Sequence, residues 1–108
     1  MSSSRLASLA LATCLAAPTF GQESTEIRGY LARLAGRDLQ AEVVREGESW
    51  LRANGSDPAG DVVRYRVGCA HLALGRDALG LGLLEPLAAR KDFEFAAESA
   101  VRAAETRL

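Results

Sequence analysis

The chain has few of the residues from which catalytic and metal sites are built. Its 108 residues include one histidine, His71, and two cysteines, Cys14 and Cys69. On a helix, Cys69 and His71 point to different sides, and no further ligand follows at metal-ligand spacing. We therefore expect no metal, no other cofactor and no enzymatic activity, with His71 a packing residue.

An excess of charge of either sign is also lacking. Thirteen basic and fourteen acidic residues give a formal net charge of −1. Surfaces that bind nucleic acid carry a marked basic excess, so we expect no nucleic-acid partner. The charged residues in Glu42–Arg52 and Glu94–Glu105 are expected to be solvated helix faces, with pairs at i,i+4 spacing.

No apolar run is long enough to span a bilayer, so stable membrane insertion is not expected. The longest, Leu6–Ala17, follows Arg5 and precedes Pro18 and the small-residue stretch "TFGQ", which is the layout of a secretory signal peptide. We expect residues 1–21 to be removed and residues 22–108 to form a secreted or periplasmic domain. Three alternatives stay open: cleavage after Ala16, a lipid anchor on Cys14 in the lipobox-like "LATC", and a buried N-terminal helix.

Strand patterns are absent too, because no segment alternates apolar and polar residues between turn dipeptides. Apolar residues instead recur every three or four positions from residue 24 onward, so we predict an all-α fold of about five helices. "DVVRYRVGCAHLALG" is apolar on two sides, which predicts a central helix. Pro86 predicts a kink or a break near Glu85. The five segments are "STEIRGYLARLAG", "RDLQAEVVREGESWLRANG", "DVVRYRVGCAHLALG", "RDALGLGLLEPLAAR" and "DFEFAAESAVRAAETRL".

Two internal similarities indicate a repeat. Gly-Arg-Asp occurs at residues 36–38 and again 39 residues later, where one helix ends and the next begins. We expect the two glycines to be left-handed at the helix ends and the two aspartates, Asp38 and Asp77, to cap the next helices. "VVRYRVG" from Val62 resembles "ESAVRAA" from Glu98, 36 residues later. Such periods are typical of helical-hairpin arrays, and we expect Gly68 and Gly80 to face each other within one hairpin.

Residues 61–94 resemble a tetratricopeptide repeat, and the run from Ser49 to Ala88 is similar to repeats of bacterial envelope proteins. HEAT-type repeats are the rival family, since "DPAGDVVRYRVG" also suits their helix starts. Either implies a short solenoid of antiparallel helical hairpins. The matching positions are Val67-Gly68 at the Leu-Gly site, Leu74-Gly75 at the turn, Gly80 at the small position and Leu84 at the Phe site; Arg64, His71 and Asp92 depart from the Trp, Tyr and Pro of the pattern.

In tetratricopeptide repeats the first helix of each pair lines a groove that holds a partner peptide. The resemblance therefore implies a partner-binding stripe of Val62, Tyr65, Cys69 and Leu72. The alternative is that the first or last helix covers this stripe in a closed bundle. We accordingly expect an exported protein–protein interaction module or scaffold of the periplasm or cell envelope, with self-association as one outcome. The alternative is a small helical enzyme accessory, or a closed HEAT-like bundle with a structural role.

Overall fold

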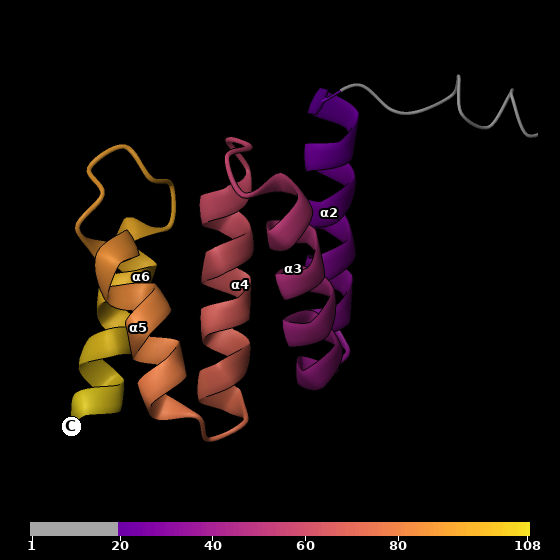
Figure 1. Ribbon diagram of the computed structural model, residues 1–108. Coiled ribbons are helices and arrows are strands. Elements are labelled where there is room, and N and C mark those ends of the chain that lie inside the picture. The colour runs from indigo at the N-terminus through magenta and orange to yellow at the C-terminus, as the bar shows by residue number, and fades with distance from the viewer. Residues whose placement is uncertain (1–19) are drawn as a thin grey trace, which may run out of the picture.

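The computed structural model describes residues 20–108, with side chains from Thr25 onward. Residues 1–19, which include Cys14 and most of the predicted signal peptide, lie outside the described residues. The described part folds into five α-helices, and it contains no strand. The prediction of an all-α fold is confirmed. The helices are α2 (Phe20–Gly36), α3 (Gln40–Asn54), α4 (Gly60–Ala73), α5 (Asp77–Ala88) and α6 (Ala96–Arg107) (Figure 1).

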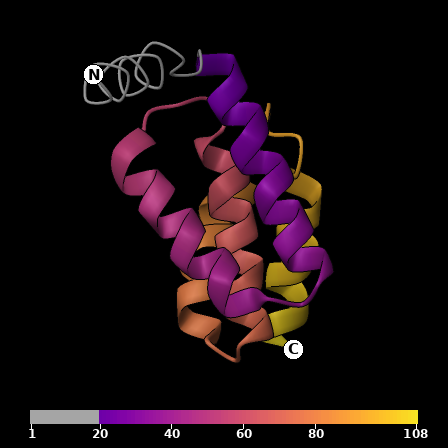
Figure 2. The ribbon, with the colours of Figure 1, turned by 90° about the vertical axis from the view of Figure 1, so that its right-hand side faces the viewer.

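The helices pack in chain order as antiparallel hairpins. Helix α4 is the central element, because it contacts α2, α3, α5 and α6. Figure 2 shows α3 to one side of the molecule and α6 to the other, with α4 between them. None of the described helices is both long enough and apolar enough to span a membrane.

Two hydrophobic clusters meet at α4, one on each of its apolar sides. The first joins α2, α3 and α4, where Leu31, Val43 and Val63 are fully buried. The second joins α4 to α5 and the loop before α6, around Tyr65 and Leu84. The prediction that the central helix is packed on more than one side is confirmed.

Glycines, which have no side chain, let α4 approach its neighbours closely. A Cβ atom on Gly80 would lie 3.0 Å from the Gly68 carbonyl oxygen and 2.5 Å from Leu72 Cδ2, so these two glycines do face each other. The sequence did not single out Gly47, yet a Cβ atom there would lie 2.4 Å from Val67 Cγ2 on α4. A Cβ atom on Gly82, in contrast, would meet no atom within 4 Å, so this glycine borders open space.

The turns α2–α3 and α4–α5 share one backbone geometry. The Leu39 amide donates to the Leu34 carbonyl at 2.9 Å, and the Arg76 amide donates to the His71 carbonyl at 2.8 Å. This six-to-one hydrogen bond is the mark of a Schellman motif. The two turns are equivalent, and the helices that follow them, α3 and α5, begin 37 residues apart.

The residue in the left-handed conformation differs from the expectation at one of the two turns. Gly75 is left-handed, with φ of 80°, but at the first turn Asp38, with φ of 60°, takes this place and Gly36 is still helical. Both capping predictions are wrong: neither α3 nor α5 has a side-chain cap, and Asp77 is already the first residue of α5. The two Gly-Arg-Asp sequences are 39 residues apart, whereas the equivalent helices begin 37 residues apart, so the sequence match is shifted by two residues from the structural match.

The last two helices also correct the expected boundaries. Helix α5 runs unbroken through Pro86 to Ala88, so a break near Glu85 does not occur. Pro86 lies in the last turn, and the carbonyl that it leaves without a helical partner belongs to the exposed Gly82. Helix α6 begins at Ala96, and the segment from Ala89 to Phe95 is a loop.

Candidate functional site

The predicted partner-binding stripe on α4 lies largely in the interior. Val62 and Tyr65 are 6% and 7% exposed, and Cys69 and Leu72 are half-buried. Sequence analysis left two arrangements open: an exposed stripe, or a stripe covered by the first or last helix. The stripe is covered, but the residues that cover it belong to α5 and the α5–α6 loop. The stripe is therefore no open apolar patch in this structure.

Two phenylalanines of the α5–α6 loop provide much of that cover. The Phe95 ring stacks on the Tyr65 ring with centroids 4.7 Å apart, and Phe93 meets Tyr65 edge-on at 6.4 Å. The guanidinium carbon of Arg66 lies 6.0 Å from the ring centroids of Tyr65 and Phe95. Such contacts favour an ordered loop. Sequence reasoning missed them because it placed both phenylalanines on the last helix.

Cys69 lies beside this aromatic cluster in an environment that favours the neutral thiol. Burial raises the pKa of the Cys69 thiol, although the Tyr65 hydroxyl and the Arg102 guanidinium partly offset this rise. Burial likewise raises the pKa of Tyr65. A thiol that stays protonated at neutral pH is a poor nucleophile, so the local electrostatics favour a packing role for Cys69.

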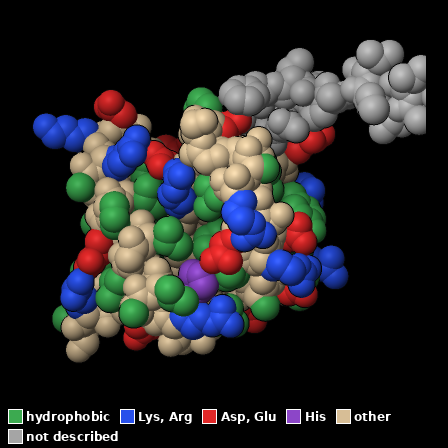
Figure 3. All heavy atoms as spheres, viewed as in Figure 1, with side chains coloured by type: hydrophobic (Ala, Val, Ile, Leu, Met, Phe, Trp, Pro, Cys, Tyr) green, Lys and Arg blue, Asp and Glu red, His purple; other side chains and the backbone are tan. Residues whose placement is uncertain are grey.

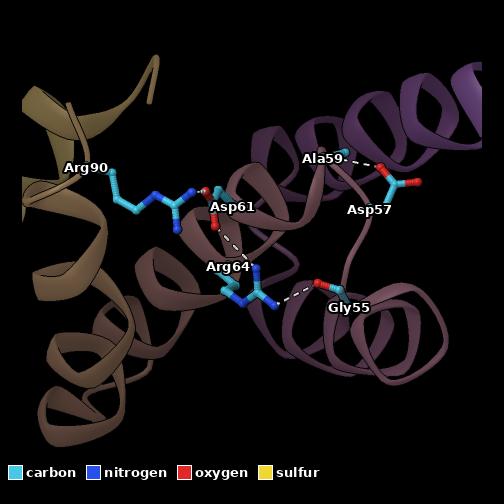
Figure 4. A network of polar contacts seen from close by, with 6 residues as sticks. All are labelled: Gly55, Asp57, Ala59, Asp61, Arg64 and Arg90. Atoms are coloured by element: carbon cyan, nitrogen blue, oxygen red, sulfur yellow. Dashed lines mark hydrogen bonds and ion pairs between the residues drawn. The ribbon is translucent and has the colours of Figure 1, made fainter. Parts of the chain in front are cut away.

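A polar network fastens the start of α4 to both of its neighbours (Figure 4). The Asp61 carboxylate pairs with Arg64 at 3.2 Å and with Arg90 at 3.1 Å. Arg64 also donates to the Gly55 carbonyl at 3.1 Å. In the preceding loop, the buried Asp57 carboxylate accepts a hydrogen bond from the Ala59 amide at 2.8 Å. The network therefore joins the α3–α4 loop and the start of the α5–α6 loop to the first turn of α4.

The single histidine is buried between helices. His71 is 3% exposed, and its Nε2 atom lies 3.5 Å from a carboxylate oxygen of Glu48. Figure 3 shows the histidine next to acidic side chains, on a face where basic and acidic groups are interspersed. Within residues 25–108, no group of three or more His, Cys, Asp or Glu side chains is arranged to hold a metal ion.

The outermost helix, in contrast, presents apolar side chains to solvent. Val101 is 56% exposed, and Leu108 is fully exposed. With the exposed Ala97 and Ala104 they form one stripe, which we call the outer face of α6. The opposite side of α6, including Ser99 and Ala103, is buried against the rest of the domain.

The internal repeat explains this arrangement. Helices α4 and α6 begin 36 residues apart, at Gly60 and Ala96, which is the separation of the sequence similarity. At this separation the buried Val63 and Val67 of α4 correspond to the buried Ser99 and Ala103 of α6.

The exposed side of α6 can be matched to α4 at the same 36-residue separation. Tyr65, Gly68 and Leu72 of α4, which pack against α5 and its loop, correspond to Val101, Ala104 and Leu108. The outer face of α6 is therefore the equivalent of a face that is covered on α4. The predicted stripe as a whole corresponds to Glu98, Val101, Glu105 and Leu108, all of which are exposed.

The charges around the outer face are uneven. Glu98 and Glu105 are exposed along one flank, and they line a shallow hollow of about 470 Å³ with Ala97, Val101 and Arg102. The Arg102 guanidinium borders the same flank, where it interacts with Cys69 and Tyr65 of α4 and with Glu105. On the other flank Arg107 forms an ion pair with Glu85 of α5. The flank with the two glutamates therefore carries a net negative charge, with Arg102 as a cation beside them.

Comparison of the chain with family models, with curated proteins and with solved structures finds no match.

Proposed function

We propose that the chain is an exported protein–protein interaction module of tetratricopeptide-like type, acting in the periplasm or cell envelope, with the outer face of α6 as its binding surface. The observation that carries the proposal is the exposure of Val101, Ala104 and Leu108, whose equivalents on α4 pack against another helix. Contiguous apolar surface that stays exposed on a folded domain is typical of an interaction site.

The proposal moves the binding surface by one repeat from the stripe that the family resemblance implies. On α4 that stripe is covered by α5 and its loop, whereas the equivalent positions on α6 are open. Each unit of a helical array packs its apolar face on the next unit. The outer face of α6, which none of the described helices covers, is therefore a place where a helix of a partner can pack.

Export is the second part of the proposal, and its support is the signal-peptide pattern of residues 1–21. A cut after Gly21 would remove only the first two residues of α2. It would leave Ile27, Leu31 and Leu34, through which α2 packs on the core. Intact-mass measurement of protein from a bacterial periplasmic fraction should show the loss of residues 1–21; a full-length chain confined to the cytoplasm would contradict export.

The binding surface can be tested by photo-crosslinking in the cells that make the protein. A photoreactive amino acid at position 101 should give a discrete higher-mass adduct, because this position lies in the outer face of α6. The matched control is position 53, since Ala53 is also exposed but lies on α3. No adduct at position 101, or the same adducts at both positions, would contradict the proposed surface.

A second candidate is a closed bundle with a structural role, and the burial of Tyr65 under the α5–α6 loop favours it. It predicts no discrete adduct at position 101, so the crosslinking experiment separates the two functions.

A further inference from the structure

We propose that the partner of the outer face of α6 is a single amphipathic helix that carries leucines on its apolar side and lysine or arginine on one flank. This inference rests on the proposed function and specifies its ligand. The partner helix would lie on α6 as α5 lies on α4.

The packing of α5 on α4 gives the apolar chemistry of the partner. Leu84 is fully buried against Gly68, where an added Cβ atom would lie 3.0 Å from the leucine side chain. Ala104 occupies the equivalent position on α6, and Ala97 lies seven residues earlier on the same face. Small residues on one helix leave room for large ones on its neighbour. Leucine side chains are therefore the best complement to this face.

The charges next to the face give the second property of the partner. Glu98 and Glu105 correspond to Val62 and Cys69 of α4, so carboxylates replace positions that are apolar or weakly polar in the covered hairpin. The last two turns of α5 carry Glu85 and no basic residue. A partner helix with that charge pattern would not complement the two glutamates of α6. Basic side chains along that flank would attract the two carboxylates and orient the docked helix.

A second copy of this chain is a poorer complement. Two α6 helices packed antiparallel would bring the acidic flanks together, because like flanks face each other in that arrangement. Arg107 is paired with Glu85 of α5, and Arg102 offsets only one of the two glutamates, so the flank keeps a net negative charge. The acidic flank thus favours a basic partner over self-association.

Two synthetic helical peptides test the inference. Both carry the same leucine face, and they differ only in having lysines or glutamates along one flank. We expect the purified protein to bind the lysine peptide roughly fivefold or more tightly than the glutamate peptide at low salt, as measured by fluorescence anisotropy. The double substitution Glu98→Gln, Glu105→Gln should remove this preference.

The substitution Val101→Glu should weaken binding of the lysine peptide by about tenfold, because it places a charge in the apolar contact. It also adds negative charge to the protein, so non-specific attraction to lysine would instead strengthen binding. Ala53→Glu on α3 is the matched control and should leave binding unchanged. Circular dichroism should show that each variant keeps its helical fold.

The other outcomes separate the inference from the proposed function. Equal binding of both peptides, lost in Val101→Glu, would overturn the basic flank but keep the docking face. A dimer in light scattering that Val101→Glu makes monomeric would identify a second copy as the occupant, which overturns the inference and keeps an interaction role. No binding, together with no effect of Val101→Glu on assembly and no discrete crosslinked adduct at position 101, would overturn both.

Discussion

Two glycines of α5 should respond oppositely to replacement by alanine. Gly80 and Gly82 lie on one helix, two positions apart, so they point in different directions. Gly80 is buried against α4, whereas Gly82 is exposed and a Cβ atom there would meet no atom within 4 Å. In a helix interior alanine is favoured over glycine by roughly 0.5–1 kcal/mol. Gly82→Ala should therefore stabilise the protein by about that amount.

At Gly80 the same propensity gain is opposed by steric overlap. The new Cβ atom would lie 2.5 Å and 2.7 Å from Leu72 Cδ2 and Cγ, and 3.0 Å from the carbonyl oxygen of Gly68. The leucine can change its rotamer, but the carbonyl is part of α4 and can move only with the backbone of that helix. Overpacking of this kind costs about 1–3 kcal/mol. After the gain in propensity is subtracted, Gly80→Ala should destabilise the protein by up to about 2.5 kcal/mol, with a central value of about 1 kcal/mol.

Thermal unfolding followed by circular dichroism measures both effects. For a domain of this size 1 kcal/mol corresponds to about 4–8 °C in Tm, so the two variants should move Tm in opposite directions from the parent protein. Urea unfolding at constant temperature gives the same comparison without a heat-capacity term. If both alanines raised Tm equally, α4 and α5 would not approach each other as closely as described.

Three further predictions concern single side chains. Asp38→Gly should stabilise the protein by about 0.5–1 kcal/mol in urea unfolding, because glycine adopts the left-handed conformation without the cost that a side chain brings; a loss of stability would show that the aspartate side chain is needed in this turn. Asp57→Ala should destabilise by about 1–2 kcal/mol, since it removes the carboxylate that accepts the Ala59 amide in a buried loop; an unchanged urea midpoint would contradict this. The stability should also fall as the pH rises above about 9, because the raised pKa values of Cys69 and Tyr65 mean that the folded state holds their protons more tightly than the unfolded chain; Cys69→Ala should reduce this slope in urea unfolding measured between pH 8 and 10, and an identical slope would refute the assignment.

The helices were predictable because their apolar spacing is strong, whereas the turns depended on details that spacing does not encode. The left-handed position of the first turn is taken by Asp38, and glycine is only the commonest residue there, so Gly36 was the natural but wrong choice. Phe93 and Phe95 fit the apolar period of the last segment. Their contacts with Tyr65 hold them in a loop instead, and tertiary contact of this kind is invisible in a local pattern.

The candidate site was predictable in its chemistry but not in its place. The sequence indicates an apolar face on α6 at Ala97, Val101 and Ala104, but periodicity alone does not say whether such a face points inward. The buried side includes Ser99, which is fully buried and whose hydroxyl donates to the Phe95 carbonyl at 2.8 Å. A serine that satisfies its own hydrogen bond on the helix can be buried at little cost. Hydrophobicity alone therefore does not identify the buried side of α6.

The signal that could have placed the site is the 36-residue similarity between Val62 and Glu98. Applied position by position, it matches Val63 to Ser99 and Tyr65 to Val101, and it thus assigns the residues of α6 to the two packed sides of α4. A helix that closes such an array carries polar residues on its outer side. On α6 the outer side carries valine, alanine and leucine next to two glutamates, and this composition supports the proposal that the helix binds a neighbour.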